Sequence, residues 1–179
     1  FPEPTAHFDR ERLSLIGDIY RQAMTTEALP SLRADVLRRS ESAQPNDGPY
    51  ASLALAYILW WDGDEEDAEQ TILRLRGRFP HDQGVAMNHA YLLIQRSRYD
   101  DALDLLKELT STDPERQDEY LSLAMWVTLM AEDQGAARDI ADRLLAIEMD
   151  ADTVYRLANA CLDEEMNDVA RTLGRRSLA

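Results

Sequence analysis

The fold is decided by residues 52–80, SLALAYILWWDGDEEDAEQTILRLRGRFP. Apolar residues around Ala56 recur at the three- and four-residue spacings of one helical face. Gly63 interrupts this pattern, Ala68 and Ile72 resume it, and Pro80 ends it, because proline does not continue a helix. The stretch therefore predicts two helices joined by a short turn.

Alanines repeat this unit along the chain with a period of 34 residues. One series is Ala56, Ala90, Ala124 and Ala158, and the second, always twelve residues later, is Ala68, Ala102, Ala136 and Ala170. A fixed period of this length is typical of stacked helical repeats, in which each unit buries its face against its neighbours. Antiparallel helices approach closely only where side chains are small. We therefore expect the two alanines of each unit to mark its helix crossing, where a large residue would cost about 1–3 kcal/mol.

These residues resemble the tetratricopeptide repeat (TPR) over residues 49–179. The similarity rests on the small residue of the first helix, the Gly63 turn before Ala68, and the closing prolines Pro80 and Pro114. The usual leading tryptophan is absent, since the four units have Ser52, Ala86, Tyr120 and Val154 there. The resemblance implies an all-α fold, a right-handed α-α superhelix of antiparallel helix pairs, that binds a protein or peptide.

We predict four repeats, 49–82, 83–116, 117–150 and 151–179, which form one continuous domain after a degenerate helix pair or cap over 1–48. The expected helices span 49–62, 65–78, 83–96, 99–111, 117–131, 133–148, 151–164 and 167–178. Glu148 stands where proline is expected, so the second helix of the third unit is expected to extend to Met149. A carboxylate before each first helix is expected to cap its free amides; these are Asp47, Asp82, Asp113 and Asp150.

The two ends depart from the repeat pattern. Apolar stripes over about 9–25 and again after Pro30 predict a helix pair before the first repeat, and residues 40–48 are the most loop-like stretch. In the last helix, Gly174 replaces an apolar core position and three arginines make the helix polar. This suits a terminal cap that faces water, or equally a frayed end.

The chain carries a net charge of −15, from 34 acidic and 19 basic side chains. Such a surface repels phosphate groups, so it disfavours nucleic acids and anionic membranes as partners. Solubility alone explains the charge, and a basic partner is the alternative. Cys161 is the single cysteine, which leaves no intrachain disulfide or cysteine metal cage.

Targeting signals do not assign a compartment. No apolar run reaches the ~18 residues that a bilayer span requires. The chain begins without Met and without the apolar core of a signal peptide, so we expect a processed or excised piece of a longer protein.

Candidate catalytic and metal-binding residues do not form a recognisable site. The acidic run over 62–69 resembles a calcium loop, but the glycine and glutamate that an EF-hand needs are replaced by Asp67 and Leu73. His7, His81 and His89 are widely spaced, and a buried, hydrogen-bonded histidine is the expectation for His89. We therefore expect no cofactor, no metal ion and no catalysis by this chain.

The predicted binding surface is the inner face formed by the first helix of each repeat. Its residues recur at the 34-residue period, and they are Leu53, Tyr57, Trp60, Met87, Tyr91, Ile94, Leu121, Met125, Tyr155 and Asn159. Thr128 and Leu162 continue one of the rows. An apolar face with an acidic rim suits an amphipathic helix with basic flanks, and it lacks the basic residues of a carboxylate clamp.

Three interpretations remain open for this face. The first is a non-catalytic protein-interaction module that binds a peptide or an amphipathic helix. In the second, the array is a structural or self-associating segment of a larger protein, with the face covered by a second copy or by the chain's own N-terminal helix, or its rows pack in the core. In the third, it is an accessory domain of an enzyme whose catalytic part lies outside this chain.

Overall fold

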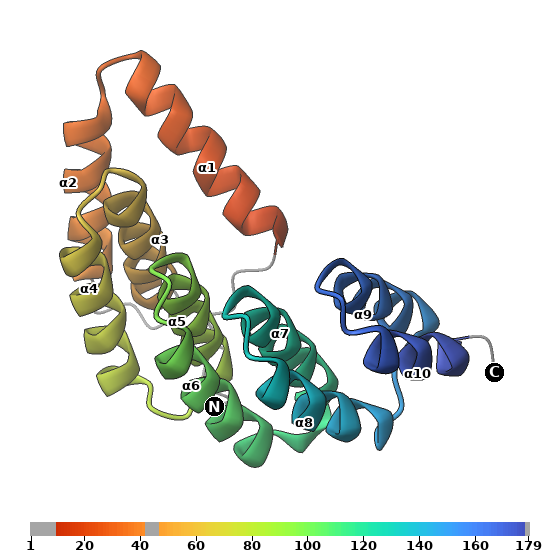
Figure 1. The fold of residues 1–179 in the computed structure, drawn as a ribbon. Helices are drawn as coiled ribbons and strands as arrows, with labels where there is room; N and C mark the ends of the chain where they lie inside the picture. Colours follow the sequence, from red (N-terminus) through yellow and green to blue (C-terminus); the bar gives the residue numbers. More distant parts are fainter. Residues whose placement is uncertain (1–9, 42–46, 178–179) are drawn as a thin grey trace. The chain divides into compact units, whose positions relative to one another are not determined.

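The computed structural model describes residues 10–41 and 47–177, which form ten α-helices and no strand (Figure 1). The helices are α1 (Arg10–Thr25), α2 (Leu29–Ser40), α3 (Asp47–Trp61), α4 (Glu65–Arg78), α5 (Gln83–Gln95), α6 (Tyr99–Thr112), α7 (Gln117–Met130), α8 (Gln134–Leu145), α9 (Ala151–Asp163) and α10 (Asn167–Ser177), with a 3-10 turn η1 (Pro114–Arg116) before α7. The all-α prediction is confirmed for these residues. His7 and residues 42–46 of the predicted loop lie outside the described part.

The predicted helix limits agree with the structure to within two residues, with one exception. α8 ends at Leu145, and the expected extension to Met149 is wrong. The backbone N–H of Ala146 bonds to the Arg143 carbonyl, a tighter three-residue spacing that ends the helix. The missing proline at 148 therefore does not lengthen α8.

The chain divides into two compact units, residues 1–92 and 93–179. The first holds α1 to α4 and most of α5, and the second holds α6 to α10. In the first unit α3 packs on both α2 and α4; in the second, α7 packs on α6, α8 and α9, and α9 packs on α10. The boundary at Leu92 and Leu93 falls inside the stretch that the sequence predicts as one continuous domain.

The two helices of each described pair are joined by the same kind of turn. One residue in each has a left-handed backbone, namely Glu27, Gly63, Ser97, Glu132 and Glu165, with φ between 55° and 88°. The N–H of the next residue bonds to a carbonyl five residues earlier, as from Asp64 to Leu59 at 2.8 Å. This is the Schellman arrangement, which satisfies carbonyls at the end of a helix. Only Gly63 is a glycine, the residue that adopts this φ without steric cost.

The alanine series lie mainly in the core, with one shift of register. Ala56 packs with Ile72 and Leu75, while Ala68 packs with larger residues of α3, so each alanine makes room for a larger side chain. In the third repeat Ala136 is only half-buried, and Ala137 is fully buried in its place. The reason is the turn: Glu132 follows Ser97 by 35 residues, so α8 starts one residue later than the period predicts.

Two of the four predicted N-caps are present. Asp82 accepts a bond from the Val85 N–H at 3.0 Å, and Asp150 accepts one from the Thr153 N–H at 2.9 Å. Asp113 is followed by η1 and accepts a hydrogen bond from the Tyr120 hydroxyl at 2.7 Å, so it does not cap α7. Asp47 begins α3, and its side chain lies outside the described part.

Candidate functional site

The structure places the predicted face of the first unit mostly in the core. Leu53, Tyr57 and Met87 are buried, and Trp60 and Tyr91 are half-buried. Leu53 belongs to the same packed cluster as Ile72 and Leu75 of α4. Buried side chains of this kind offer no surface to a partner.

A buried hydrogen bond fixes Tyr57 in that core. Its hydroxyl donates to Asn88 Oδ1 at 2.9 Å, and Asn88 Nδ2 donates in turn to the Gly84 carbonyl at 2.7 Å. Burial raises the pKa of the Tyr57 phenol, and the neighbouring Tyr91 adds to the effect. Tyr57 therefore joins α3 to α5 and does not face a ligand groove.

In the second unit the predicted face is divided. Ile94, Leu121 and Met125 are buried, whereas Tyr155 is 59% exposed and Asn159 is also exposed. The burial of the other predicted members has a simple physical reason. The inner positions of a first helix can pack against a neighbouring hairpin. A core between repeats and an open groove both require apolar residues at the same period, so the period does not distinguish them.

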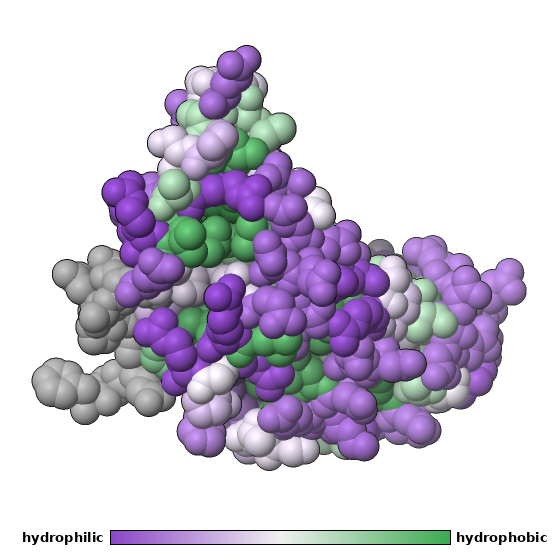
Figure 2. Space-filling model, turned by 90° about the vertical axis from the view of Figure 1, so that its left-hand side faces the viewer, coloured by the Kyte–Doolittle hydropathy of each residue, from purple (hydrophilic) through white to green (hydrophobic). Residues whose placement is uncertain are grey.

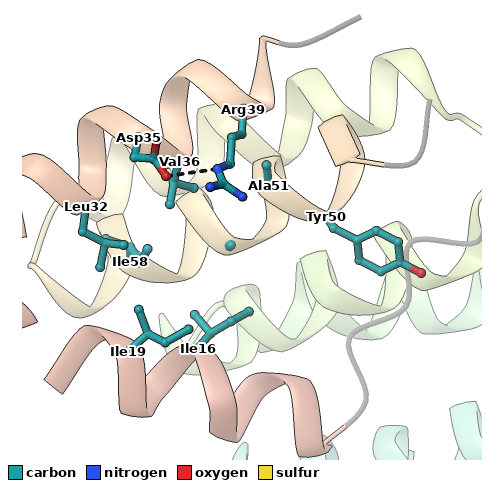
Figure 3. A pocket seen from close by; sticks show the side chains of 10 residues that line it. Ile16, Ile19, Leu32, Asp35, Val36, Arg39, Tyr50, Ala51 and Ile58 are labelled. Carbon is teal, nitrogen blue, oxygen red and sulfur yellow. Dashed lines mark hydrogen bonds and ion pairs between the residues drawn. The ribbon is translucent and has the colours of Figure 1, made fainter. Parts of the chain in front are cut away.

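An apolar cavity that the sequence did not indicate lies in the first unit between α1, α2 and α3. Its volume is about 430 Å³, and its lining residues are Ile16, Ile19, Leu32, Asp35, Val36, Arg39, Tyr50, Ala51, Ala54 and Ile58. In Figure 3, Ile16 and Ile19 point from α1 across the cavity toward Leu32, Val36 and Ile58. We call this cavity the N-terminal groove.

Two contacts hold the walls of the N-terminal groove together. Tyr20 on α1 packs against Trp61 at the end of α3, with ring centroids 5.5 Å apart and the ring planes tilted by 47°. Arg33 on α2 donates to Asp62 at 2.5 Å and to Asp64 at 2.6 Å, in the turn after α3. Burial lowers the pKa of Arg33, but these two carboxylates raise it more, so the net shift is upward.

The rim of the groove carries one carboxylate shared by two arginines. Arg39 Nε donates to Asp35 at 3.0 Å, and Arg38 donates to the other oxygen of Asp35 at 3.1 Å. Both arginine side chains are at least 70% exposed. The α2 edge of the groove is therefore locally positive, in contrast to the net charge of the chain.

Apolar side chains also come to the surface near this hairpin. Figure 2 shows green side chains below the α1–α2 turn, which lies at the top of the view, with purple hydrophilic side chains around them. Ile19 is 43% exposed and Leu37 is 47% exposed. Ile19 lines the groove and Leu37 does not, although both belong to the same helix pair.

Among the residues that the structure describes, the titratable side chains give no sign of a reactive centre. Burial raises the pKa of Cys161 to about 11, with a smaller contribution from Asp168, so the thiol is protonated near neutral pH. His89 is buried, with Nδ1 at 3.3 Å from an Arg76 nitrogen. In the described residues no group of three His, Cys, Asp or Glu is placed to hold a metal ion. None of the helices described there is long and apolar enough to span a membrane.

The only sequence signal for the N-terminal groove is the set of apolar residues Ile16, Ile19, Leu32 and Val36. These residues form apolar stripes on two consecutive helices. Nothing in the spacing distinguishes a stripe that packs tightly from one that leaves a cavity. The groove therefore emerges only from the three-dimensional packing of α1.

Comparison with known proteins identifies the fold. No protein-family model and no curated protein matches the chain. A solved structure of a MamA RS-1 ArsTM double mutant is 12% identical, covers 92% of each chain and superposes with a TM-score of 0.59. A second solved structure contains the nearly identical TPR-like repeats of a putative kinesin light chain from Podospora anserina. Its sequence is 11% identical to this chain, the match covers 96% of this chain and 95% of that one, and the TM-score is 0.64.

Identities this low show the fold alone, and that fold is TPR-like. The prediction of an all-α solenoid of antiparallel helix pairs is therefore confirmed.

Proposed function

We propose that this chain is a non-catalytic protein-interaction module that binds an amphipathic helix of a partner in the N-terminal groove. The observation that carries the proposal is the groove itself. It is a cavity of about 430 Å³ with a mainly apolar lining, in which Asp35 and Arg39 are the charged members, and Ile19 in this lining remains 43% exposed. Pockets lined by apolar side chains with a few polar groups are the usual places where proteins take up a ligand.

The walls of the groove favour a helix as its ligand. α1 and α3 already present rows of apolar side chains along their axes, and a third helix can pack its own ridge between such rows. The partner would present apolar residues at i, i+4 and i+7 toward Ile16, Ile19 and Val36.

The charges of the chain suggest the polar side of this partner. A net charge of −15 attracts basic residues at long range, which supports basic flanks outside the groove. Beside the exposed Arg38 and Arg39, however, a basic residue would meet like charge. The partner helix would therefore be basic at its ends and neutral or acidic next to α2.

Of the face predicted from the sequence, only part retains accessible surface. Trp60 and Tyr91 are half-buried, and Tyr155 and Asn159 are exposed. Their contact with a partner stays a prediction, separate from the N-terminal groove.

A binding titration tests the proposal. The probe is a fluorescently labelled synthetic helix with leucines on one face and lysines at its ends, and the readout is anisotropy. We expect Ile19→Glu to remove binding, because the carboxylate would lie in the apolar groove. Leu37→Glu is the matched control, since Leu37 is equally exposed on the same helix pair but lies outside the lining.

Circular dichroism of both variants checks that the helices are intact. Equal affinity of the wild-type chain for a scrambled peptide without the apolar face would overturn the proposal, as would equal binding by both variants.

A further inference from the structure

The outer face of α9 is exposed at positions that are buried one repeat earlier. On α7, Leu121, Met125 and Thr128 are at most 3% exposed. The residues 34 positions later on α9 are Tyr155, Asn159 and Leu162; Tyr155 is 59% exposed, Leu162 is 50% exposed, and Asn159 is also exposed. Both helices belong to the second unit, where α9 packs on α7.

α9 therefore has two sides that are suited to packing, of which one is buried in the described structure and the other is exposed. Val154, Leu157 and Cys161 are at most 1% exposed and form its buried side. Tyr155, Asn159 and Leu162 lie at i, i+4 and i+7, so they form a second stripe along the same helix. Tyr155 and Asn159 belong to the face that the sequence predicts as the inner one, but in the structure they are exposed, and we call this stripe the α9 outer face.

A terminal cap does not account for the α9 outer face. Capping units of helical arrays have polar outer surfaces that water can cover. α10 fits that description, because Arg171, Thr172 and Arg175 are exposed on it. The tyrosine and leucine of α9 do not, and each exposes half or more of its surface.

We propose that the α9 outer face pairs with the same face of a second copy of this chain, with the two α9 helices antiparallel and Asn159 at the two-fold axis. This inference does not rest on the N-terminal groove. Its premise is that positions buried on α7 should also be buried 34 residues later on α9. In the last described helix pair, a second copy would cover these positions in the place of a following repeat.

The stripe is self-complementary in this arrangement. Antiparallel helices centred on Asn159 bring Tyr155 against the partner's Leu162 and, by symmetry, Leu162 against the partner's Tyr155. Asn159 meets the partner's Asn159, and the two amides can bond to each other because each has a donor and an acceptor. A single polar residue of this kind at a helix seam fixes the register.

Charges beside the stripe select the antiparallel direction. Arg156 and Asp163 are seven residues apart, so they lie on the same flank of the α9 outer face. Antiparallel pairing sets Arg156 opposite the partner's Asp163 at two symmetric places. In a parallel pair the same flank of the two helices lies on opposite sides of the seam, so Arg156 would not meet the partner's Asp163 and neither charge would gain a partner.

Arg156 is free to make this exchange because its present contacts are on the surface. It pairs with Asp152 at 3.2 Å, and the two side chains are 63% and 76% exposed. Ion pairs exposed to this extent contribute little to folding. Pairing with the partner's Asp163 would therefore not disturb the fold of the helix.

The expected dimer is weak. A single helix pair buries less surface than the ~1,200 Å² of a stable protein interface. Two chains that each carry a net charge of −15 also repel each other, although salt at 0.15 M limits this repulsion to a Debye length of about 8 Å. We therefore expect a dissociation constant in roughly the micromolar range or above.

Charge reversal with sedimentation velocity tests both the face and its direction. The chain of 179 residues should dimerise with rising concentration. Arg156→Asp and Asp163→Arg should each weaken dimerisation by about tenfold or more, since each puts like charges together at both symmetric places. The double variant, and an equimolar mixture of the two single variants, should restore it.

Restoration in the mixture also shows that the single variants are folded. Leu73→Asp is the control for a general loss of exposed apolar surface, because Leu73 is 39% exposed on α4 of the first unit, and it should leave dimerisation unchanged. A wild-type chain that stays monomeric at the highest soluble concentration would overturn the proposal, and a following repeat or another protein would then have to cover the face. Dimerisation that is insensitive to both single reversals would overturn it as well.

Discussion

The rings of Tyr20 and Trp61 pack against each other at a tilt, with their centroids 5.5 Å apart, and thereby attach α1 to the end of α3. Trp61 also contacts the rings of Tyr57 and Trp60, at 5.7 and 6.5 Å, so the N-terminal helix is attached to an aromatic cluster of the first repeat. This attachment sets the width of the N-terminal groove, because Ile16 and Ile19 lie on the same helix as Tyr20.

Loss of the Tyr20 ring should release α1. We expect Tyr20→Ala to destabilise the docked helix by about 0.5–1.5 kcal/mol beyond the loss of buried area, which is the value of such an aromatic pair. Hydrogen exchange of the α1 amides measures it, and exchange should be faster in α1 than in α4. Tyr20→Phe retains the ring and should exchange like the wild type. If α1 exchanges equally fast in the alanine variant and in the wild type, the contact between the two rings does not hold the helix.

Two glycines should respond to alanine with opposite signs. A Cβ at Gly63 or at Gly77 would meet no atom within 4 Å, so packing is not involved in either case. Gly63 has φ +88°, and Gly63→Ala should therefore destabilise by about 1 kcal/mol or more. Gly77 lies in the last turn of α4, where Gly77→Ala should still stabilise, by about 0.5 kcal/mol or less, because the full cost of glycine applies to the middle of a helix. Urea denaturation gives both values, and the same sign for both would refute the conformational argument.

The left-handed turn of the third repeat should be improved by glycine. Glu132 has φ 56°, so Glu132→Gly should stabilise the chain by about 0.5–1 kcal/mol, after allowance for the extra freedom of glycine in the unfolded state. The neighbouring Ala131 has φ −82° and is the control, because Ala131→Gly should not stabilise. The midpoints of thermal denaturation of the two variants are compared with that of the wild type. A midpoint for Ala131→Gly above that of Glu132→Gly would contradict the argument from the left-handed backbone of Glu132.

Removal of the Tyr57 hydroxyl should leave a buried amide unsatisfied. Its bond to Asn88 is 2.9 Å long, and Asn88 is 1% exposed. We expect Tyr57→Phe to cost about 1–3 kcal/mol, the penalty for a buried polar group that loses its partner. Adding Asn88→Leu should cost less than the sum of the single changes, because both partners are then absent. A double-mutant cycle by urea denaturation measures this coupling, and strict additivity would exclude it.

The cap at Asp150 should make part of the stability depend on pH. The Thr153 side chain and N–H, which bond to the carboxylate, hold the pKa of Asp150 below its ordinary value of 3.8. A carboxylate with a lowered folded-state pKa stabilises above the unfolded-state pKa, and this contribution is lost as pH falls through the folded-state value. Asp150→Asn retains an N-cap without titration. The stability difference between wild type and variant should therefore shrink below about pH 4, and a constant difference from pH 7 to pH 2 would contradict the prediction.

The local pattern of the sequence was sufficient for the helices and for most turns. Gly63, Pro80 and the alanine period act through neighbouring residues, so they define the helix limits without knowledge of the fold. The prediction was wrong at Ala136, because one additional residue before the turn at Glu132 moves Ala137 into the core. It was also wrong at Asp113, where η1 separates the carboxylate from the helix that it was expected to cap.

The sequence was less informative about surfaces. Leu53, Met87 and Tyr155 occupy equivalent positions and are all suited to an inner face, yet the first two are buried and the third is exposed. Their exposure depends on whether another hairpin packs beside them, and this is not a property of the 34-residue unit. The N-terminal groove could not be predicted for a similar reason, since it is the space that α1 leaves against α2 and α3.

The sequence by itself determined that the chain forms helical pairs of a TPR-like fold, because periodicity and turn residues act over a few positions along the chain. Only the tertiary structure decided which apolar positions are core and which are surface. Burial is a property of the contacts between hairpins, and the same leucine or tyrosine satisfies the pattern in either place. The N-terminal groove beside Ile19 and the α9 outer face through Asn159 were therefore decided by the tertiary structure, because the helices packed beside a helix determine which of its sides is exposed to solvent.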